Sequence, residues 1–308
     1  MTSLVPYMEQ GLNGIQFGVM LFLMAAGLTL VFGIMNVVNL AHGSFYMVGA
    51  YVSAATFTAT GSFTVAVLAA LVATALVGVL VETSVFRSLY RRDHIDQVLA
   101  TFGLTLTFNE IVRLIWGDSG LYAAVPPFLS GFVEVMPGLR YPAYRLAIIV
   151  AGLAVALFLY VLVTRTRLGM LIRAGASNRV MAGALGVNIT VLYTAVFALG
   201  AALAALSGLM AGPIYAVASG MGDNIVVFAF VVIVVGGIGS IRGAFIAALF
   251  LGLVDTLGRA FLGSLLRFVM TATAADNTGP ALASMLIYIL MAAVLFFRPQ
   301  GLFPPRVR

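Results

Sequence analysis

Long apolar runs alternate with short polar segments along the whole chain. The runs are rich in Leu, Val, Ala and Gly and lack the alternating pattern of a membrane β-barrel, so they favour helices. At roughly 20 apolar residues per crossing, the length allows about eight or nine membrane spans. We predict an all-α fold, a polytopic transmembrane helical bundle with broken or re-entrant helices that forms one domain over residues 1–308. The predicted segments are 11–35, 43–60, 62–86, 98–116, 144–163, 189–212, 224–235, 243–262 and 281–297.

The stretch NVVNLAHGSF, between the first two runs, concentrates polar groups in a chain that has few of them. Gly43 permits the backbone to break there, and Asn39 or Ser44 is a candidate cap for the second span. Interrupted helices at membrane depth often mark the substrate route of a transporter. We therefore predict a substrate pathway at Asn36, Asn39, His42 and Ser44. The alternative is a polar turn at the inner membrane surface with His42 exposed.

A second glycine-interrupted stretch, VVGGIGSIRGAF, follows the seventh run. It lacks the lysine and the spacing of a P-loop, which argues against nucleotide binding. We predict a second broken helix here, with the glycines Gly236, Gly237, Gly239 and Gly243. The similarity of LAHGSF to SIRGAF suggests an internal repeat.

Composition excludes a soluble protein, because 62% of the 308 residues are hydrophobic and only 8% are charged, against about 25% charged in an ordinary soluble domain. There is no cysteine, and the two histidines form no metal-binding or catalytic motif. The sequence therefore gives no support to an enzyme or a metal site.

The acidic residues have structural explanations. Glu110 and Arg113, and likewise Asp255 and Arg259, are spaced to pair on one helix face, the alternative being a gate or a site for a charged substrate group. Glu82 lies near an inner helix end and is expected to snorkel.

All 16 cationic residues are arginine, and their placement orients the spans. With nine spans, one face receives Arg87, Arg91, Arg92, Arg165, Arg167, Arg173, Arg179, Arg242, Arg298, Arg306 and Arg308. The opposite face and the span ends receive Arg113, Arg140, Arg145, Arg259 and Arg267. This asymmetry predicts a cytoplasmic C-terminus and an outer N-terminus, and it explains the +6 charge without a nucleic-acid partner.

Small residues recur every fourth position in GAALAALSGLMAG, at Gly200, Ala204, Gly208 and Gly212. This spacing predicts a face on which another helix packs closely. The alternative is a chance result of a span rich in Gly and Ala.

The cytoplasmic loop at about 164–188 contains a short predicted helix that begins at a Ser177 cap and stops at Gly186. Its apolar side is formed by Val180, Met181, Ala184 and Leu185. Two turns are too few to be stable alone in water, so this side should dock on lipid headgroups or on another protein.

Three stretches carry a family resemblance: GIMNVVNLAHGSFYMVGAYV, RTRLGMLIRAGASNRVMAGALGVNITVLYTAVFALGAALAALSGLMAGPIY and VVIVVGGIGSIRGAFIAALFLG. They resemble the LivH-type permease subunits of ATP-binding-cassette importers for branched-chain amino acids, and the resemblance covers nearly the whole chain. It implies an inner-membrane protein that binds no cofactor itself. The implied partners are a LivM-type second permease, two LivG/LivF-type ATPases that hold ATP and Mg, and a periplasmic substrate-binding protein.

The resemblance also implies that the helix from Arg179 to Gly186 couples the permease to its ATPases. The family's Glu-Ala-Ala sequence corresponds here to Val180, Met181 and Ala182, so the glutamate is missing and apolar docking is expected. The cargo is left open between branched-chain amino acids, urea, short amides and aromatic acids. The alternative functions are a stand-alone secondary transporter or channel, and an integral-membrane enzyme.

Overall fold

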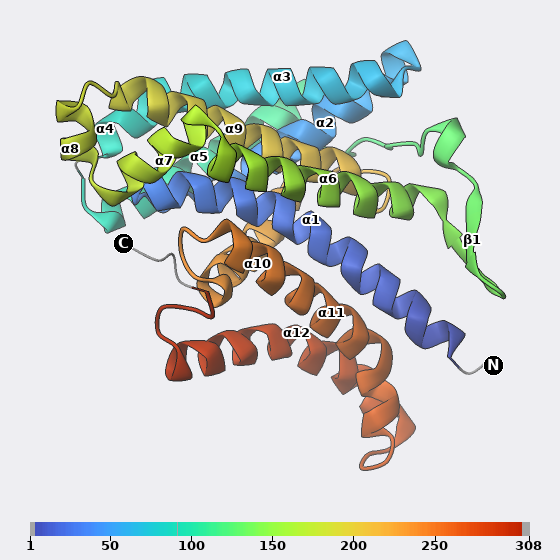
Figure 1. Cartoon of the computed structure of the whole chain (residues 1–308). Coiled ribbons are helices and arrows are strands. Elements are labelled where there is room, and N and C mark those ends of the chain that lie inside the picture. Colours follow the sequence, from blue (N-terminus) through green and yellow to red (C-terminus); the bar gives the residue numbers. More distant parts are fainter. Residues whose placement is uncertain (1–3, 91, 304–308) are drawn as a thin grey trace.

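The computed structural model describes residues 4–90 and 92–303, and it is almost entirely helical (Figure 1). Arg91, Arg306 and Arg308 of the arginine pattern lie outside the described residues. The helices are α1 (Val5–Met35), α2 (His42–Thr60), α3 (Phe63–Val81), α4 (Arg87–Leu89), α5 (His94–Trp116), α6 (Ala143–Arg165), α7 (Arg167–Ser177), α8 (Arg179–Ala184), α9 (Ile189–Ala211), α10 (Met221–Gly236), α11 (Ile241–Leu266) and α12 (Ala272–Phe297). The shorter elements are a π-helix, η1 (Glu82–Phe86), a 3-10 helix, η2 (Pro127–Leu129), and two strands, β1 (Phe132–Met136) and β2 (Leu139–Pro142).

Within residues 4–90 and 92–303, seven helical segments are long and apolar enough to cross a membrane. They are Val5–Met35, Phe63–Leu89, His94–Trp116, Ala143–Arg165, Ile189–Ala211, Ile241–Leu266 and Ala272–Phe297. The other two predicted spans form α2, which carries several hydroxyl groups, and α10, which has only 16 residues. The all-α polytopic bundle with interrupted helices is confirmed, with seven candidate spans where eight or nine were predicted.

The two ends of the bundle differ (Figure 1). One end carries α4, α7 and α8, and the other carries the antiparallel hairpin of β1 and β2, which the sequence analysis missed. The hairpin is anchored to the bundle because the Tyr141 hydroxyl donates to Asn13 Oδ1 of α1 at 2.9 Å.

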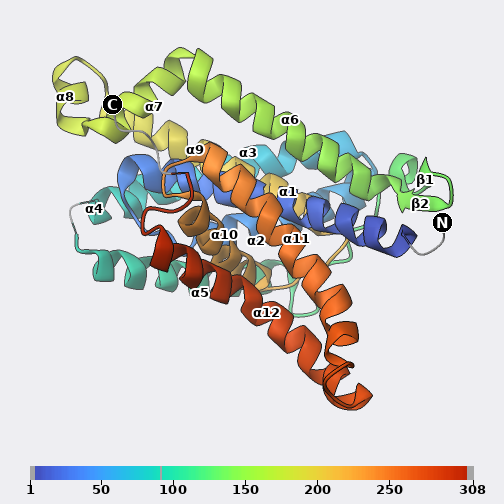
Figure 2. The same cartoon turned by 60° about the horizontal axis from the view of Figure 1, so that its bottom comes forward.

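Helix α1 runs through the middle of the bundle and contacts α6, α9, α10 and α11 (Figures 1 and 2). The backbones of α1 and α11 come into close contact, since a methyl group on Gly18 would lie 2.8 Å from the Ala248 carbonyl oxygen. Helices α11 and α12 form a hairpin whose tip projects away from the other helices (Figure 2). The core therefore surrounds α1, and the later helices extend one side of it.

The small-residue face of α9 packs closely, as predicted. Gly200 lies against Gly27 of α1, and a methyl group on Gly208 would overlap the Tyr46 carbonyl oxygen of α2. Since lipid gives helices no hydrophobic reason to associate, such close packing is one of the main attractions between them.

Both predicted acid–arginine pairs are present. Arg113 bonds Glu110, and Arg259 bonds Asp255, each at 2.8 Å. The second pair is partly buried, because the Asp255 side chain is 7% exposed.

The snorkelling predicted for Glu82 is wrong, since its side chain is 0% exposed. Its carboxylate accepts hydrogen bonds from the Tyr90 hydroxyl at 2.8 Å and the Thr194 hydroxyl at 2.7 Å, and Arg87 lies at 3.5 Å. With these partners the carboxylate is satisfied inside the protein and has no need to reach the membrane surface.

Candidate functional site

The first predicted helix break is present. Helix α1 ends at Met35, and Asn36 takes a left-handed conformation with a φ of 54°, the one positive value among the described non-glycine residues. Residues 36–41 are not helical, and α2 begins at His42. Asparagine tolerates the left-handed conformation better than most residues, which explains why the helix ends there.

The segment after this break runs back into the bundle. A methyl group on Gly27 would lie 2.9 Å from His42 Nε2, and Gly27 is eight residues before the end of α1, about 12 Å along its axis. His42 is 1% exposed and Asn39 is 0% exposed. The alternative of an exposed polar turn at the membrane surface is therefore wrong.

Several polar atoms around the start of α2 are buried without a hydrogen-bond partner among the described residues. They are Asn39 Oδ1 and Nδ2, His42 Nδ1 and Nε2, and Ser44 Oγ. Asn39 and Ser44 do not cap α2, whose N-cap is Ala41 without a side-chain bond, so that prediction is wrong. A buried unsatisfied polar group costs about 1–3 kcal/mol, and such a cluster calls for an explanation such as a ligand site.

The starts of α2 and α10 meet next to this cluster. A methyl group on Gly43 would overlap the carbonyl oxygen of Gly222. Gly43 was predicted to break the chain, but it lies inside α2 and instead permits this close approach. The N-terminus of a helix carries a partial positive charge and attracts anionic groups. Asp223, in the first turn of α10, is exposed and accepts a hydrogen bond from Asn109 at 3.4 Å.

The second predicted break lies between α10 and α11. Gly237 and Gly239 have φ values of 104° and 81°, which other residues rarely adopt. Gly236 and Gly243 lie within the adjoining helices, so they do not form the break but pack against each other across it. Ser240 caps α11 by accepting a hydrogen bond from the Gly243 amide at 3.1 Å.

Residues 298–303 form a C-terminal strap that covers this second break. The sequence analysis did not predict the strap. The amides of Leu302 and Phe303 donate to the carbonyls of Val235 and Gly236 at 2.8 and 3.1 Å. The strap satisfies carbonyl groups that the end of α10 leaves open.

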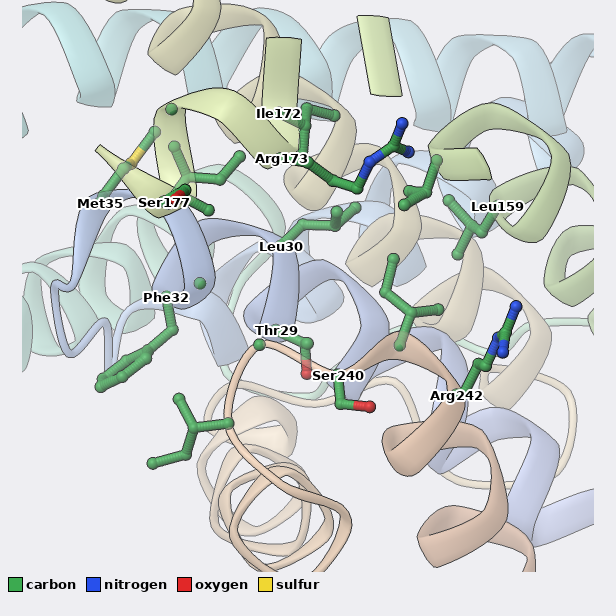
Figure 3. A pocket seen from close by; sticks show the side chains of 18 of the residues that line it. Thr29, Leu30, Phe32, Met35, Leu159, Ile172, Arg173, Ser177, Ser240 and Arg242 are labelled. Carbon is green, nitrogen blue, oxygen red and sulfur yellow. The ribbon is translucent and has the colours of Figure 1, made fainter. Parts of the chain in front are cut away.

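A cavity of about 1550 Å³ lies between α1, α6, α7 and α11 (Figure 3). Of the predicted pathway residues it touches Asn36, but not Asn39, His42 or Ser44. Thr29 lines it, whereas His42 lies against Gly27. Residues two apart lie on opposite sides of a helix, so the cavity and the buried polar cluster are on different faces of α1.

The predicted cytoplasmic helix is α8, at the end of the bundle that also carries α4 and α7 (Figure 1). Its cap is Asn178, whose side chain accepts from the Met181 amide at 2.9 Å. Ser177 was predicted as the cap, but it is the last residue of α7. The helix stops before Gly186, whose φ is 90°, as predicted.

The apolar side of α8 has no partner within the described part of the chain. Val180 is 77% exposed and Leu185 is 79% exposed, and Met181 is also exposed. Arg179 and Ala184 are exposed beside them, while Ala182 faces the bundle. Residues 4–90 and 92–303 contain no group of three or more His, Cys, Asp or Glu side chains that could hold a metal ion.

Comparison with known proteins gives consistent matches. The family described as "Branched-chain amino acid transport system / permease component" matches residues 11–295. The high-affinity branched-chain amino acid transport system permease protein BraD of Pseudomonas aeruginosa is 30% identical, with 98% of this chain and 97% of that protein covered. The permease protein LivH of Escherichia coli K12 is 30% identical, with 84% and 88% covered. A probable LivH of Methanocaldococcus jannaschii is 27% identical, with 92% and 88% covered. No solved structure matches the chain.

Proposed function

Because the chain belongs to the family of branched-chain amino acid transport permease components, we propose that it forms part of the membrane pathway of an importer that moves branched-chain amino acids and is driven by ATP. It is a multi-pass inner-membrane transport component rather than an enzyme. The observation that carries the proposal is the exposed apolar side of α8 at one end of a bundle with two interrupted helices.

The energy source lies on partner subunits in this proposal. Two LivG/LivF-type ATPases, which bind ATP and Mg, dock on the side of α8 formed by Val180, Met181 and Leu185. Arg179 and Ala184 complete this coupling helix, and Gly186 lies just after its end. Closure of the ATPases on ATP favours one conformation of the permease over the other, which is how a ligand shifts a two-state equilibrium.

The remaining partners follow from this arrangement. A LivM-type permease completes the membrane part, and a periplasmic binding protein delivers the amino acid. The end with α8 and the C-terminus faces the cytoplasm, and the N-terminus and the β-hairpin face the periplasm (Figure 1). The arginines of α7 and α8 support this orientation.

The substrate route follows the first break. Asn36, Asn39, His42 and Ser44 offer hydrogen-bonding groups, and the N-termini of α2 and α10 favour the carboxylate of an amino-acid zwitterion. Asn39, His42 and Ser44 are buried, so this conformation is closed to substrate at those residues. The break glycines Gly237 and Gly239 give the adjoining helices a place to hinge.

Uptake in proteoliposomes tests the proposal. The chain with its partners should accumulate leucine when ATP is supplied, and the chain alone should accumulate none. Asn39→Ala with His42→Ala should lower uptake at least about tenfold, since each change removes contacts of roughly 1 kcal/mol or more. Ser53→Ala on the same helix is the control, because its hydroxyl already bonds the Ala50 carbonyl. Concentrative uptake by the chain alone would support a secondary transporter instead.

A further inference from the structure

We propose that the cavity between α1, α6, α7 and α11 binds an anionic phospholipid of the cytoplasmic leaflet. The cavity lies at the end of the bundle that carries α7 and α8 (Figures 1 and 3). Of the residues on the proposed substrate route the cavity touches Asn36 alone, and Asn39, His42 and Ser44 do not line it.

The charge of the cavity is entirely positive. Arg173, Arg179 and Arg242 line it, and no lining residue is Asp or Glu. Among the described residues, none of the ion pairs involves these three arginines. Three guanidinium groups without a counter-charge would attract an anion, and the planar fork of arginine suits a phosphate group.

The guanidinium groups come from different walls of the cavity. Figure 3 shows Arg173 and Arg242 on different sides of the cavity, Arg173 on α7 and Arg242 on α11. The Arg242 guanidinium lies over the ring of Tyr160 on α6, 5.1 Å from its centroid, which helps to hold it in place. The cavity therefore offers anion-binding groups on both α7 and α11.

The rest of the lining is mostly apolar and suits acyl chains. Tyr160 and Ile246 line the cavity and are also exposed, so the cavity opens to the outside of the bundle between α6 and α11. Phe245 and Ala156 line it as well. A free phosphate would leave this apolar surface uncovered, whereas a phospholipid covers it and places its headgroup at the arginines. Basic pockets between helices on the cytoplasmic side are typical of anionic-lipid sites.

Native mass spectrometry of the purified importer complex, titrated with phosphatidylglycerol, tests the proposal. The complex should retain phosphatidylglycerol in preference to phosphatidylcholine. Arg173→Ala with Arg242→Ala should weaken phosphatidylglycerol binding roughly thirtyfold, from the usual effect of two basic residues near anionic lipid. Arg165→Ala with Arg167→Ala is the matched control, because it removes two arginines at the same end that do not line the cavity. This control should stay within about twofold of the unchanged protein.

A second variant keeps the charges and fills the apolar part. Ala156→Trp should weaken phosphatidylglycerol binding while the protein keeps its unfolding temperature. An equal loss in the Arg165 and Arg167 control would show general surface attraction and overturn the proposal. Full competition by inorganic phosphate at the same concentration would show a site for a free anion and would also overturn it. Binding to the separate chain but not to the complex would show that a partner subunit covers the cavity, with the same consequence.

Discussion

Gly43 of α2 and Gly222 of α10 touch through their backbones, so that two helices begin side by side next to the buried polar cluster. Neither helix starts at an end of the bundle. The contact places the partial positive charges of two helix N-termini beside Asn39, His42 and Ser44, and it has no room for a side chain at either glycine.

Gly43→Ala should therefore separate α2 from α10. The new methyl group would overlap the Gly222 carbonyl oxygen, and such overpacking typically costs about 1–3 kcal/mol. The expected result is a lower unfolding temperature and lower uptake. Gly103→Ala on α5 is the control, since nothing lies within 4 Å of the added carbon. Its stability should be unchanged or raised by up to about 1 kcal/mol, and an equal loss in both variants would contradict the packing explanation.

The coupling role of α8 predicts an assembly defect. Val180→Ser with Leu185→Ser removes two exposed apolar side chains and should weaken ATPase binding at least about tenfold, the usual size for central interface residues. Co-purification of the ATPases measures this effect. Phe128→Ser, which changes a similarly exposed residue in η2 at the other end of the bundle, should leave co-purification unaltered. If the double variant still co-purified normally with the ATPases, α8 would not be their docking site.

Glu82 is expected to matter for stability more than an exposed carboxylate does. Glu82→Ala would leave the Tyr90 hydroxyl without its carboxylate acceptor and Arg87 without its counter-charge. The Thr194 hydroxyl would keep the Thr190 carbonyl as acceptor at 3.1 Å. Removing one partner of a fully buried ion pair costs about 3–5 kcal/mol. The cost is lower here because Arg87 is partly exposed and water can solvate its charge. Chemical unfolding of the variant should show a loss of at least ~1 kcal/mol. Glu110→Ala removes an exposed pair and should change the unfolding free energy by less than about 1 kcal/mol.

The C-terminal strap should control access to the second break. Gly301 has a φ of 80°, and a methyl group there would lie 2.6 Å from the Gly237 Cα. Gly301→Val should displace the strap. The chain has no cysteine, so Val235→Cys, at a 0% exposed residue whose carbonyl accepts from the strap, provides a unique thiol whose labelling rate should then rise. Gly138→Val is the control, because it is strained in the same way but lies in the open turn of the β-hairpin. Equal labelling rates in the two backgrounds would show that the strap does not protect the break.

Much of this architecture could be predicted from residue patterns. Apolar runs of membrane length located the helices because a bilayer requires a helix to satisfy its own backbone groups. The left-handed Asn36, Gly237 and Gly239 follow from residue types that allow a helix to end. Fourth-residue spacing of small side chains correctly indicated the packing face of α9.

Other features were misread because several local solutions had similar energies. Ser177 and Asn178 are both good caps, and the observed helix ends select Asn178. Glu82 lies near a helix end, a position from which a carboxylate can also snorkel to the membrane surface. Its burial depends on Thr194, which is 112 residues away in the sequence.

The sequence by itself determined that the chain crosses a membrane, where its helices break and which short helix is left exposed, because these depend on local hydrophobicity and backbone conformation. Tertiary structure decided that residues 36–41 return along α1, that Gly43 meets Gly222 and that three arginines from separate helices share one cavity. These features depend on contacts between distant segments, whose free energy comes from packing and from partners that no local pattern contains.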